Sequence, residues 1–327
     1  MKDKLGEAGV SVVGCGRWGG FLGYYMATIK SCAVTMQGIE SDPGYQSLLR
    51  ERRNEYLAIP DNVRMTTSID EVLADDFIVV SVGAQNFRGF CRSIAGRRLS
   101  GKYFLLAMKG LEESTGKRLT EVFREEISDE SAKAAVLLGP GHVQDYLRGV
   151  PSCVVVDSEY DQVKREIADF INSDLIRAYY GNDLIGNEIG GAMKNVIGIA
   201  AGILDGLGWH GLKGALMARA PIEVGRLISY FGGNPQSAYG LTHLGDYEAT
   251  LFSQNSHNRK YGEDLVRGVK FGKLAEGVAT LKAAYMLRDR VEIPICERLY
   301  ETVFEGRDPK QQINLLFQRP MKTEFEF

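Results

Sequence analysis

The stretch from Val10 to Ile29 constrains the fold of this chain more than any other. A short apolar run, Val10 to Val13, leads into the glycine-rich turn GCGRWG, and a second apolar stretch follows. Such a run is typical of a buried parallel strand, and the order strand, glycine turn and helix makes a GxGxxG pattern informative. Gly14 permits the tight turn, Gly16 lets a pyrophosphate approach the backbone, and Gly19 allows helix and strand to pack closely. The first N–H groups of the helix then face the phosphates, so the stretch predicts a dinucleotide site.

An acidic residue after the next predicted strand indicates which dinucleotide binds. The apolar run Ala33 to Ile39 ends at Glu40. This is about twenty residues beyond the last glycine of the turn, where an acid binds the ribose hydroxyls of the adenosine. An acidic side chain repels a 2'-phosphate, so Glu40 favours NAD over NADP. Asp42 offers the same chemistry, and NADP stays possible because three arginines follow. They are Arg50, Arg52 and Arg53.

Strands and helices alternate through the following residues. The pattern predicts strands at 77–82, 103–107, 134–138, 154–156 and 175–179, and a helix at 85–94. This alternation is typical of a doubly wound parallel sheet, in which ligands bind outside the carboxyl ends of the strands. Lys109, Gly139 and Gly141 follow directly after predicted strands. We expect them at the ligand crevice, with a strand cap or a solvent-exposed side chain as the alternative for Lys109.

The character of the sequence changes near residue 181. Beyond it the pattern is helical, with amphipathic stretches at 215–230, 263–269, 274–289 and 295–304. A chain of 327 residues exceeds the usual size of a single core, which favours two domains. We therefore expect an α/β fold. A Rossmann-type dinucleotide-binding domain with a doubly wound sheet, residues 1–181, precedes an all-helical substrate-binding and catalytic domain, residues 182–327.

One helix of the expected second domain combines glycines with a lysine. The stretch 183–207 holds Lys194 in one series with four glycines, all spaced by four residues or a multiple of four. The glycines are Gly186, Gly190, Gly198 and Gly202. Residues four apart share one face of a helix, and each interior glycine costs roughly 0.5 to 1 kcal/mol, so the pattern needs a reason. Either the face packs tightly beside a snorkelling lysine, or the glycines next to Lys194 leave space for a small substrate.

Composition and charge exclude several classes of protein. The net charge is -3 without a long basic run, which disfavours nucleic-acid binding. The start of the chain lacks an apolar signal core, and no run approaches the roughly eighteen apolar residues of a membrane span, so we expect a cytoplasmic protein. The five cysteines are scattered, and the four histidines show no metal-binding spacing. We expect reduced thiols, no metal and, because apolar helix faces can pair between copies, a homodimer.

Several motifs, in order along the chain, resemble those of one enzyme family. GCGRWG is similar to GxGxWG, MKG to KG, LLGPGHVQD to SGPxxAxE, and GGAMKNVIGIAAGILDGLG to GALKNVxAIxxGxxDGLG. GLTHLGDYEAT, SHNRKYG and AEGVATLKAAYML are similar to GLxGLGDLxxT, SRNRRxG and xEGxxTxxAxxxL. These motifs belong to the NAD(P)-dependent glycerol-3-phosphate dehydrogenases, which interconvert dihydroxyacetone phosphate and sn-glycerol 3-phosphate. The resemblance covers nearly the whole chain and implies a fold like that of 6-phosphogluconate dehydrogenase.

The resemblance implies a set of site residues. Lys194 would be the catalytic proton donor or acceptor, Lys109 would lie beside the reacting carbonyl, and Asp246 would hold Lys194 in position. The cofactor would contact Gly14, Gly16, Arg17, Trp18, Gly19, Glu40, Lys109, Val143 and Glu276. The substrate would contact Lys109, Gly139, Gly141, Lys194, Asn195, Asp246, Thr250, Ser256, His257 and Asn258. Hydride transfer to a ketone leaves an alkoxide, and two lysines supply the proton and the positive charge that it needs.

Some positions depart from the family's pattern. His257 stands where the family has the arginine that binds the substrate phosphate, and histidine makes no bidentate pair with phosphate. Either Arg259 or Lys260 compensates, or the substrate differs. His243 replaces a glycine, and the segment ahead of Lys213 is shortened by one residue.

Three functions are consistent with these residues. The leading hypothesis is reversible NAD-dependent reduction of dihydroxyacetone phosphate to sn-glycerol 3-phosphate by lysine acid/base catalysis, feeding glycerophospholipid synthesis. The first alternative, suggested by His257, is a related dehydrogenase of another small keto or polyol phosphate or of a keto acid. The second is a nicotinamide-nucleotide sensor without catalysis. Such a sensor is expected to have lost its catalytic lysines, whereas Lys109 and Lys194 are both present.

Overall fold

The structure, a computed structural model, describes residues 9–253 and 256–324. The chain forms two compact units. The first comprises Met1–Met108 and Leu119–Asn182, and the second comprises Lys109–Arg118 and Asp183–Phe327. The domain boundary expected at residue 181 is close to the second junction. The expected division places the segment 109–118 in the first domain. In the structure this segment follows a strand of the first unit but packs with the second unit.

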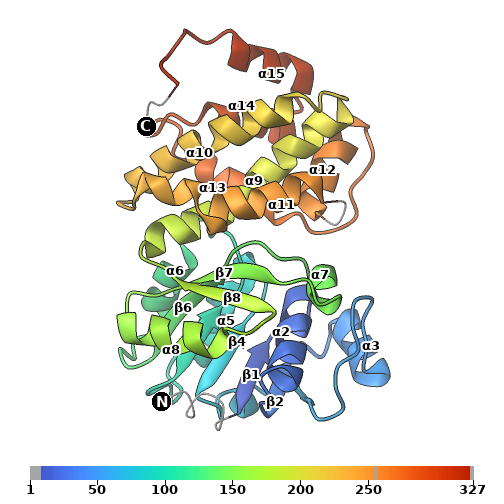
Figure 1. Ribbon diagram of the computed structural model, residues 1–327, viewed down its shortest axis with the longest axis vertical. Coiled ribbons are helices and arrows are strands. Elements are labelled where there is room, and N and C mark those ends of the chain that lie inside the picture. Colours follow the sequence, from blue (N-terminus) through green and yellow to red (C-terminus); the bar gives the residue numbers. More distant parts are fainter. Residues whose placement is uncertain (1–8, 254–255, 325–327) are drawn as a thin grey trace. The chain divides into compact units, whose positions relative to one another are not determined.

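The first unit is built on an eight-stranded sheet with the order β3-β2-β1-β4-β5-β6-β7-β8 (Figure 1). The strands are β1 (Val10–Val13), β2 (Val34–Gln37), β3 (Arg64–Thr66), β4 (Phe77–Val80), β5 (Tyr103–Leu106), β6 (Lys133–Leu138), β7 (Ser152–Asp157) and β8 (Ile176–Tyr180). Neighbouring strands pair in parallel except β6 and β7, which are antiparallel. The order from β3 to β6 is that of a doubly wound dinucleotide-binding sheet. The expected fold class is confirmed.

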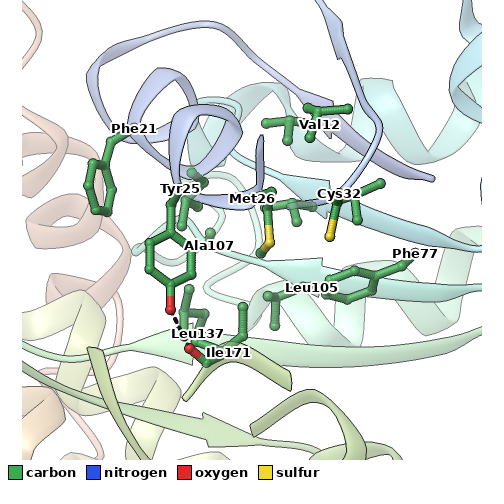
Figure 2. Packing of buried hydrophobic residues seen from close by; sticks show 14 of the residues in the cluster. Val12, Phe21, Tyr25, Met26, Cys32, Phe77, Leu105, Ala107, Leu137 and Ile171 are labelled. Carbon is green, nitrogen blue, oxygen red and sulfur yellow. Dashed lines mark hydrogen bonds between the residues drawn. The ribbon is translucent and has the colours of Figure 1, made fainter. Parts of the chain in front are cut away.

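Helices cover both faces of this sheet. They are α2 (Arg17–Thr28), α3 (Pro43–Glu51), α4 (Ile69–Val72), η1 (Ala84–Asn86), α5 (Phe87–Ile94), α6 (Leu119–Glu126), α7 (Val143–Leu147) and α8 (Asp161–Ile171). Figure 2 shows the core beneath α2, where Tyr25 donates a hydrogen bond to the carbonyl oxygen of Ile171 in α8 and belongs to the same apolar cluster as Leu105 of β5. Successive strand residues point to opposite faces, so Phe104 packs instead against Phe123 of α6.

The sequence predicts every strand except β3. The predicted strand at 10–13 coincides with β1, and the other predicted strands overlap the observed ones with ends that differ by a few residues. β3 comprises only three residues, and Arg64 at its start is exposed. So short a strand, with one exposed residue, carries no hydrophobic periodicity, and only its pairing with β2 defines it.

The second unit is helical. Its elements are α9 (Leu184–Gly206), α10 (Leu212–Tyr230), η2 (Pro235–Tyr239), η3 (Leu241–Gly245), α11 (Asp246–Phe252), α12 (His257–Val266), α13 (Glu276–Tyr285), α14 (Pro294–Phe304) and α15 (Pro309–Phe317). The long helix α9 packs against α10, α11, α12 and α13 (Figure 1). The predicted helix at 263–269 corresponds to the end of α12, which begins at His257 because the Ser256 hydroxyl accepts a hydrogen bond from the Arg259 N–H. Across the described residues, none of the helices has the length and apolar character to cross a membrane.

Candidate active site

Two lysines from distant parts of the chain meet one aspartate in the second unit. Lys194 lies in the middle of α9, Asp246 is the first residue of α11, and Lys109 begins the segment 109–118. The Lys194 Nζ lies 3.1 Å from Oδ1 of Asp246, and Lys109 forms an ion pair with Oδ2. The side chains of Lys194 and Asp246 are only 14% and 5% exposed. The cluster therefore concentrates two cations on one buried carboxylate.

Burial and charge set the protonation of this cluster. Burial lowers the pKa of Lys109, and the charge of Lys194 adds to the effect, although Asp246 opposes it. Burial alone would raise the pKa of Asp246, but the two lysines outweigh it and hold that pKa below its ordinary value. Burial raises the pKa of the nearby Glu276 carboxyl, against the charges of Lys194 and Lys109. The arrangement keeps Asp246 ionised and makes the proton of Lys109 easier to donate.

Polar side chains surround the lysines. The Lys194 ammonium donates to Oγ1 of Thr250 at 3.2 Å, and the Thr250 hydroxyl donates to the carbonyl oxygen of Asp246 at 2.9 Å. These contacts hold the ammonium against the start of α11. Thr250, predicted as a substrate-site residue, therefore lies beside Lys194 and Asp246.

A chain of amides leaves one donor available beside the cluster. The Gly277 N–H donates to Oδ1 of Asn258 at 2.9 Å, which orients Asn258 so that its Nδ2 donates to Oδ1 of Asn195, also at 2.9 Å. Nδ2 of Asn195 is buried and has no hydrogen-bond partner among the described residues. A buried donor of this kind is costly unless a ligand or water accepts from it. Asn195 therefore carries a donor that the described residues leave unsatisfied.

Gly277 was not among the predicted site residues. A Cβ at Gly277 would lie 2.5 Å from the carbonyl oxygen of Asn195, so only glycine allows the backbone of α13 to reach the two asparagines. The glycine directly after Glu276 in the motif AEG is the one sequence signal for this role.

The glycines beside Lys194 face protein atoms rather than open space. A Cβ at Gly190 would lie 3.0 Å from the Cβ of His243, and a Cβ at Gly198 would lie 3.0 Å from Cγ2 of Thr250. Farther along, a Cβ at Gly202 would overlap the carbonyl oxygen of Arg259 in α12. Of the two explanations offered for these glycines, space for a substrate is therefore wrong, and tight packing accounts for them. They bring the neighbouring helices, and the polar side chains those helices carry, against α9.

His243 stands where the resembled family has glycine, and it is buried against α9. Its Nδ1 lies 3.0 Å from the carbonyl oxygen of Gly190, one turn before Lys194, and its ring packs on Tyr247 at 4.9 Å. Burial lowers the pKa of His243 to about 4, so the ring is neutral and Nδ1 donates to the carbonyl. His243 belongs to η3, a π-helical turn that leads directly to Asp246.

The cations expected to replace the missing arginine are engaged elsewhere. Nη1 of Arg259 lies 2.7 Å from Oδ2 of Asp205, and Lys260 lies 2.8 Å from Oδ1 of Asp264. His257, the first residue of α12, is half-buried, and its ring lies 6.2 Å from that of Phe271. The missing arginine leaves two alternatives, compensation by Arg259 or Lys260, or a different substrate. The ion pairs of Arg259 and Lys260 weaken the first of these.

In the first unit, the glycine-rich turn has the geometry that its sequence predicts. Gly14 has φ +95°, and a Cβ there would lie 2.5 Å from the carbonyl oxygen of Ser81. A Cβ at Gly19 would overlap the backbone of Gly14, whereas one at Gly16 would meet no atom within 4 Å. Gly16 is the residue before α2, and the free N–H groups at the start of a helix form the kind of site that binds phosphates. The open backbone at Gly16 fits a dinucleotide pyrophosphate.

Residues around this turn have assignable neighbours. The Arg17 guanidinium lies 4.8 Å from the centre of the Tyr56 ring, and the Trp18 ring stacks on Phe21 at 5.4 Å. Glu40 is exposed just after β2, whereas Asp42 caps α3 by accepting a hydrogen bond from the Tyr45 N–H at 2.8 Å. Of the two acids considered for ribose binding, Glu40 is thus exposed, whereas one oxygen of the Asp42 carboxylate is already engaged.

The remaining predicted site residues are divided between the two units. Gly139 and Gly141 follow β6 in the first unit with φ of +134° and +154°. Val143 is 2% exposed, and its side chain belongs to the core of that unit. Lys109 and Glu276 belong to the second unit. The described residues hold no cluster of three or more His, Cys, Asp or Glu side chains that could bind a metal ion.

The first unit is a doubly wound sheet with an open glycine turn, and the second unit carries a buried lysine pair. These two features define the class of nicotinamide-dinucleotide-dependent dehydrogenases. Residues 9–164 match the N-terminal part of NAD-dependent glycerol-3-phosphate dehydrogenase, and residues 183–314 match its C-terminal part. The chain belongs to the NAD-dependent glycerol-3-phosphate dehydrogenase family and is an NAD(P)-dependent oxidoreductase.

Individual relatives support this assignment over the full length of the chain. Glycerol-3-phosphate dehydrogenase [NAD(P)+] of Clostridium botulinum is 33% identical and covers 96% of this chain and 98% of its own. The enzyme of the same name from an Exiguobacterium species is 34% identical over 98% of each chain. The crystal structure of glycerol-3-phosphate dehydrogenase from Coxiella burnetii superposes with a TM-score of 0.88 at 26% identity, covering 95% of this chain and 99% of its own.

Proposed function

We propose that this protein interconverts dihydroxyacetone phosphate and sn-glycerol 3-phosphate with NAD, and that Lys194 is the acid/base. The observation that carries the proposal is the convergence of Lys194 and Lys109 on the buried Asp246. A neutral site would bind a triose but would not stabilise the negative charge that develops on its oxygen. Two cations on one carboxylate leave a net positive charge where an alkoxide forms.

Each residue of the cluster has a distinct task in this proposal. When bound, the nicotinamide supplies or accepts the hydride at the substrate's C2. In the reductive direction Lys194 gives its proton to the carbonyl oxygen, which becomes the hydroxyl, and the lysine is left neutral until solvent reprotonates it. Lys109 stabilises the same oxygen by its charge, and Asp246 orients both ammonium groups. The Nδ2 of Asn195, which has no partner among the described residues, donates to a substrate oxygen.

NAD is the proposed cofactor in preference to NADP. The exposed carboxylate of Glu40 supports this proposal, because it accepts hydrogen bonds from ribose hydroxyls and repels a 2'-phosphate. Replacing Glu40 with Ser removes the charge, and the ratio of kcat/KM for NADH to that for NADPH is expected to fall at least about tenfold. An unchanged ratio would assign cofactor choice to other residues.

The direct test is reduction of dihydroxyacetone phosphate by NADH, followed by the loss of nicotinamide absorbance. Lys194→Met is expected to lower kcat at least about a hundredfold, since general acid catalysis contributes about 10² to 10⁴ in rate. Lys282→Met is the matched control, because Lys282 is 50% exposed and pairs with Glu113 rather than with Asp246. Protein that binds NADH but turns over no triose phosphate contradicts the substrate. A Lys194→Met variant that keeps its rate contradicts the mechanism.

A second candidate function follows from α12. Because Arg259 and Lys260 already pair with carboxylates, a substrate whose far end is a less charged group than phosphate also fits the site. Such a substrate would be another keto or polyol compound, or a keto acid. The His257→Arg variant separates the two candidates. A lower KM for dihydroxyacetone phosphate supports a phosphate beside residue 257, and an unchanged KM together with turnover of a keto acid supports the alternative.

The cellular setting belongs to the same proposal. Five free thiols in the described chain are consistent with a reducing compartment, and we retain the cytoplasm as the proposed location. A homodimer and a supply of glycerol 3-phosphate for glycerophospholipid synthesis complete the proposal. Sedimentation of the purified protein tests the oligomeric state.

A further inference from the structure

The second unit contains an apolar cavity near the C-terminal end of α9. Its volume is about 230 Å³, and its walls come from the last turns of α9 and from α10, α14 and α15. Aliphatic side chains dominate the walls, among them Leu204, Leu216, Ile222, Leu299, Ile313 and Leu316. Apolar cavities of about 150 Å³ in proteins bind benzene, so this one is large enough for an organic ligand. Lys194, Lys109 and Asp246 are not among the lining residues.

Positive charge gathers at one part of this cavity. Arg226 and Arg319 line it, and both form ion pairs with Glu292, at 3.4 Å for Arg226. Lys322 also contacts Glu292, at 2.6 Å. One carboxylate thus meets three cations, and the pKa of Glu292 is lowered first by its hydrogen bond to Lys322 and further by the two arginines. An additional anion at this place is electrostatically favoured.

Glu223, the acidic residue that lines the cavity, does not cancel the positive charge of these three side chains. Glu223 turns both carboxylate oxygens toward the start of α14, where it accepts hydrogen bonds from the N–H groups of Ile295 at 2.7 Å and Cys296 at 2.9 Å. Burial raises the pKa of Glu223 to about 7, so part of the population is neutral at that pH. The cavity therefore has aliphatic walls and a cationic edge, which is formed by Arg226, Arg319 and Lys322.

We propose that this cavity binds an anionic amphiphile, a single aliphatic chain that ends in a carboxylate or a phosphate monoester. The chain occupies the space between the aliphatic walls, and the head group lies at Arg226, Arg319 and Lys322. A longer chain buries more apolar surface, so each added methylene increases affinity about fourfold until the cavity is full. A head group without negative charge gains nothing from the cationic edge.

Calorimetric titration of the full chain tests the ligand class. The probes are hexanoate, octanoate, decanoate, decyl phosphate, decanol and decyltrimethylammonium, each below its micellar concentration. We expect affinity to rise from hexanoate toward decanoate, and the alcohol and the ammonium probe to bind at least about tenfold more weakly than decanoate. The decanoate and decyl phosphate titrations distinguish a fatty acid from a phosphorylated lipid as the source of the head group.

Two pairs of variants locate the binding. Ala215 is exposed on α10 and lines the cavity, whereas Ala218 is exposed on the same helix and does not line it. Ala215→Trp is expected to weaken decanoate binding at least about tenfold, and Ala218→Trp to leave it unchanged. Arg319→Gln should weaken decanoate binding without changing that of decanol. Arg307→Gln is the control, because Arg307 is exposed and outside the lining.

Several results would overturn the proposal. No detectable heat with decanoate or decyl phosphate rules out the ligand class, and equal binding of decanol rules out the role of the cationic edge. If Ala215→Trp, but not Ala218→Trp, dissociates a dimer in sedimentation and decanoate does not bind, the cavity is a contact between two copies of the chain. Because titration requires no catalysis, these outcomes are independent of the proposed reaction.

Discussion

At the scale of single residues, the proposed chemistry depends on the charge balance around Asp246. Asp246 pairs with two lysines, and its carboxylate raises the pKa of Lys109 against the lowering caused by burial. Removing that carboxylate charge while keeping the side-chain shape isolates its electrostatic part.

Asp246→Asn is expected to move the alkaline limb of the pH profile to lower pH. Without the carboxylate the pKa of Lys109 falls further, so the positive charge that stabilises the alkoxide is lost at a lower pH than in the natural protein. The measurement is kcat/KM for ketone reduction as a function of pH. Thr250→Ser is the control, since it keeps the hydroxyl that accepts from Lys194. A limb that stays in place in Asp246→Asn contradicts this electrostatic role.

His243 makes the stability of the fold sensitive to acid. Its pKa is about 4 in the folded chain and about 6.5 when unfolded, because burial disfavours the imidazolium. Between these values the unfolded state binds more protons, so the contribution of His243 is fully present above pH 6.5 and is lost as the pH falls toward 4. The difference of the two values corresponds to about 3 kcal/mol.

His243→Phe is therefore expected to flatten this acid dependence. Its unfolding free energy should be lower than that of the natural protein at pH 7, because the hydrogen bond to the Gly190 carbonyl is lost, and the gap should narrow toward pH 4. Urea unfolding at a series of pH values measures the gap. His210→Asn is the control, since the His210 side chain is 69% exposed. A gap that is constant with pH removes His243 as the cause.

At the scale of elements, the close packing of α9 and α12 depends on glycine. A Cβ at Gly202 would overlap the carbonyl oxygen of Arg259, and a Cβ at Gly262 would overlap that of Ile199. Both neighbours are backbone atoms, which cannot rotate away. This packing also brings Asn258 to Asn195, so it shapes the site as well as the core.

Gly202→Ala is expected to destabilise the protein by about 1 to 3 kcal/mol, the usual cost of forcing extra atoms into a packed interior. Gly214→Ala in α10 is the matched control. A Cβ there meets nothing within 4 Å, so the substitution should gain roughly 0.5 to 1 kcal/mol from helix propensity. The measurement is the midpoint of urea unfolding of each variant, compared with that of the natural protein. A Gly202→Ala protein as stable as the Gly214→Ala protein contradicts the packing.

At the scale of the whole molecule, cofactor binding is linked to stability. A cofactor at a hundred times its Kd stabilises the state that binds it by about 2.7 kcal/mol, so NADH should raise the melting temperature of the natural protein. Gly16 offers a way to separate this effect from folding. It has φ -69°, which alanine adopts without strain, and no atom lies within 4 Å of the position of a Cβ.

Gly16→Ala is expected to fold with unchanged stability but to bind NADH at least about tenfold more weakly, because its methyl group occupies the place of the approaching pyrophosphate. NADH titration by fluorescence and melting curves with and without NADH test this. Gly89→Ala is the control, since a Cβ there also meets no atom within 4 Å. Equal NADH affinity in the two variants contradicts the assignment of the phosphate site.

Much of the first unit is determined by the sequence alone. Buried parallel strands consist of apolar runs, and the turn GCGRWG requires glycines for reasons that are local to the backbone. The strands other than β3, and the need for glycine at Gly14 and Gly19, are therefore predictable from neighbouring residues. Lys194 is predictable for a different reason, since its surrounding motif GGAMKNVIGIAAGILDGLG is long and specific.

Only the tertiary structure decides how side chains far apart in sequence are paired. Lys109 follows a strand of the first unit, yet the segment 109–118 belongs with the helices and places Lys109 on Asp246. Arg259 was a candidate for binding phosphate, but it pairs with Asp205. The glycines flanking Lys194 predict either packing or an open site, and the residues opposite them settle the choice. Local sequence patterns indicate which residues are buried and which backbone conformation they adopt. The partner of a charged side chain, or of a glycine-lined helix face, depends instead on which distant segment of the chain folds against it.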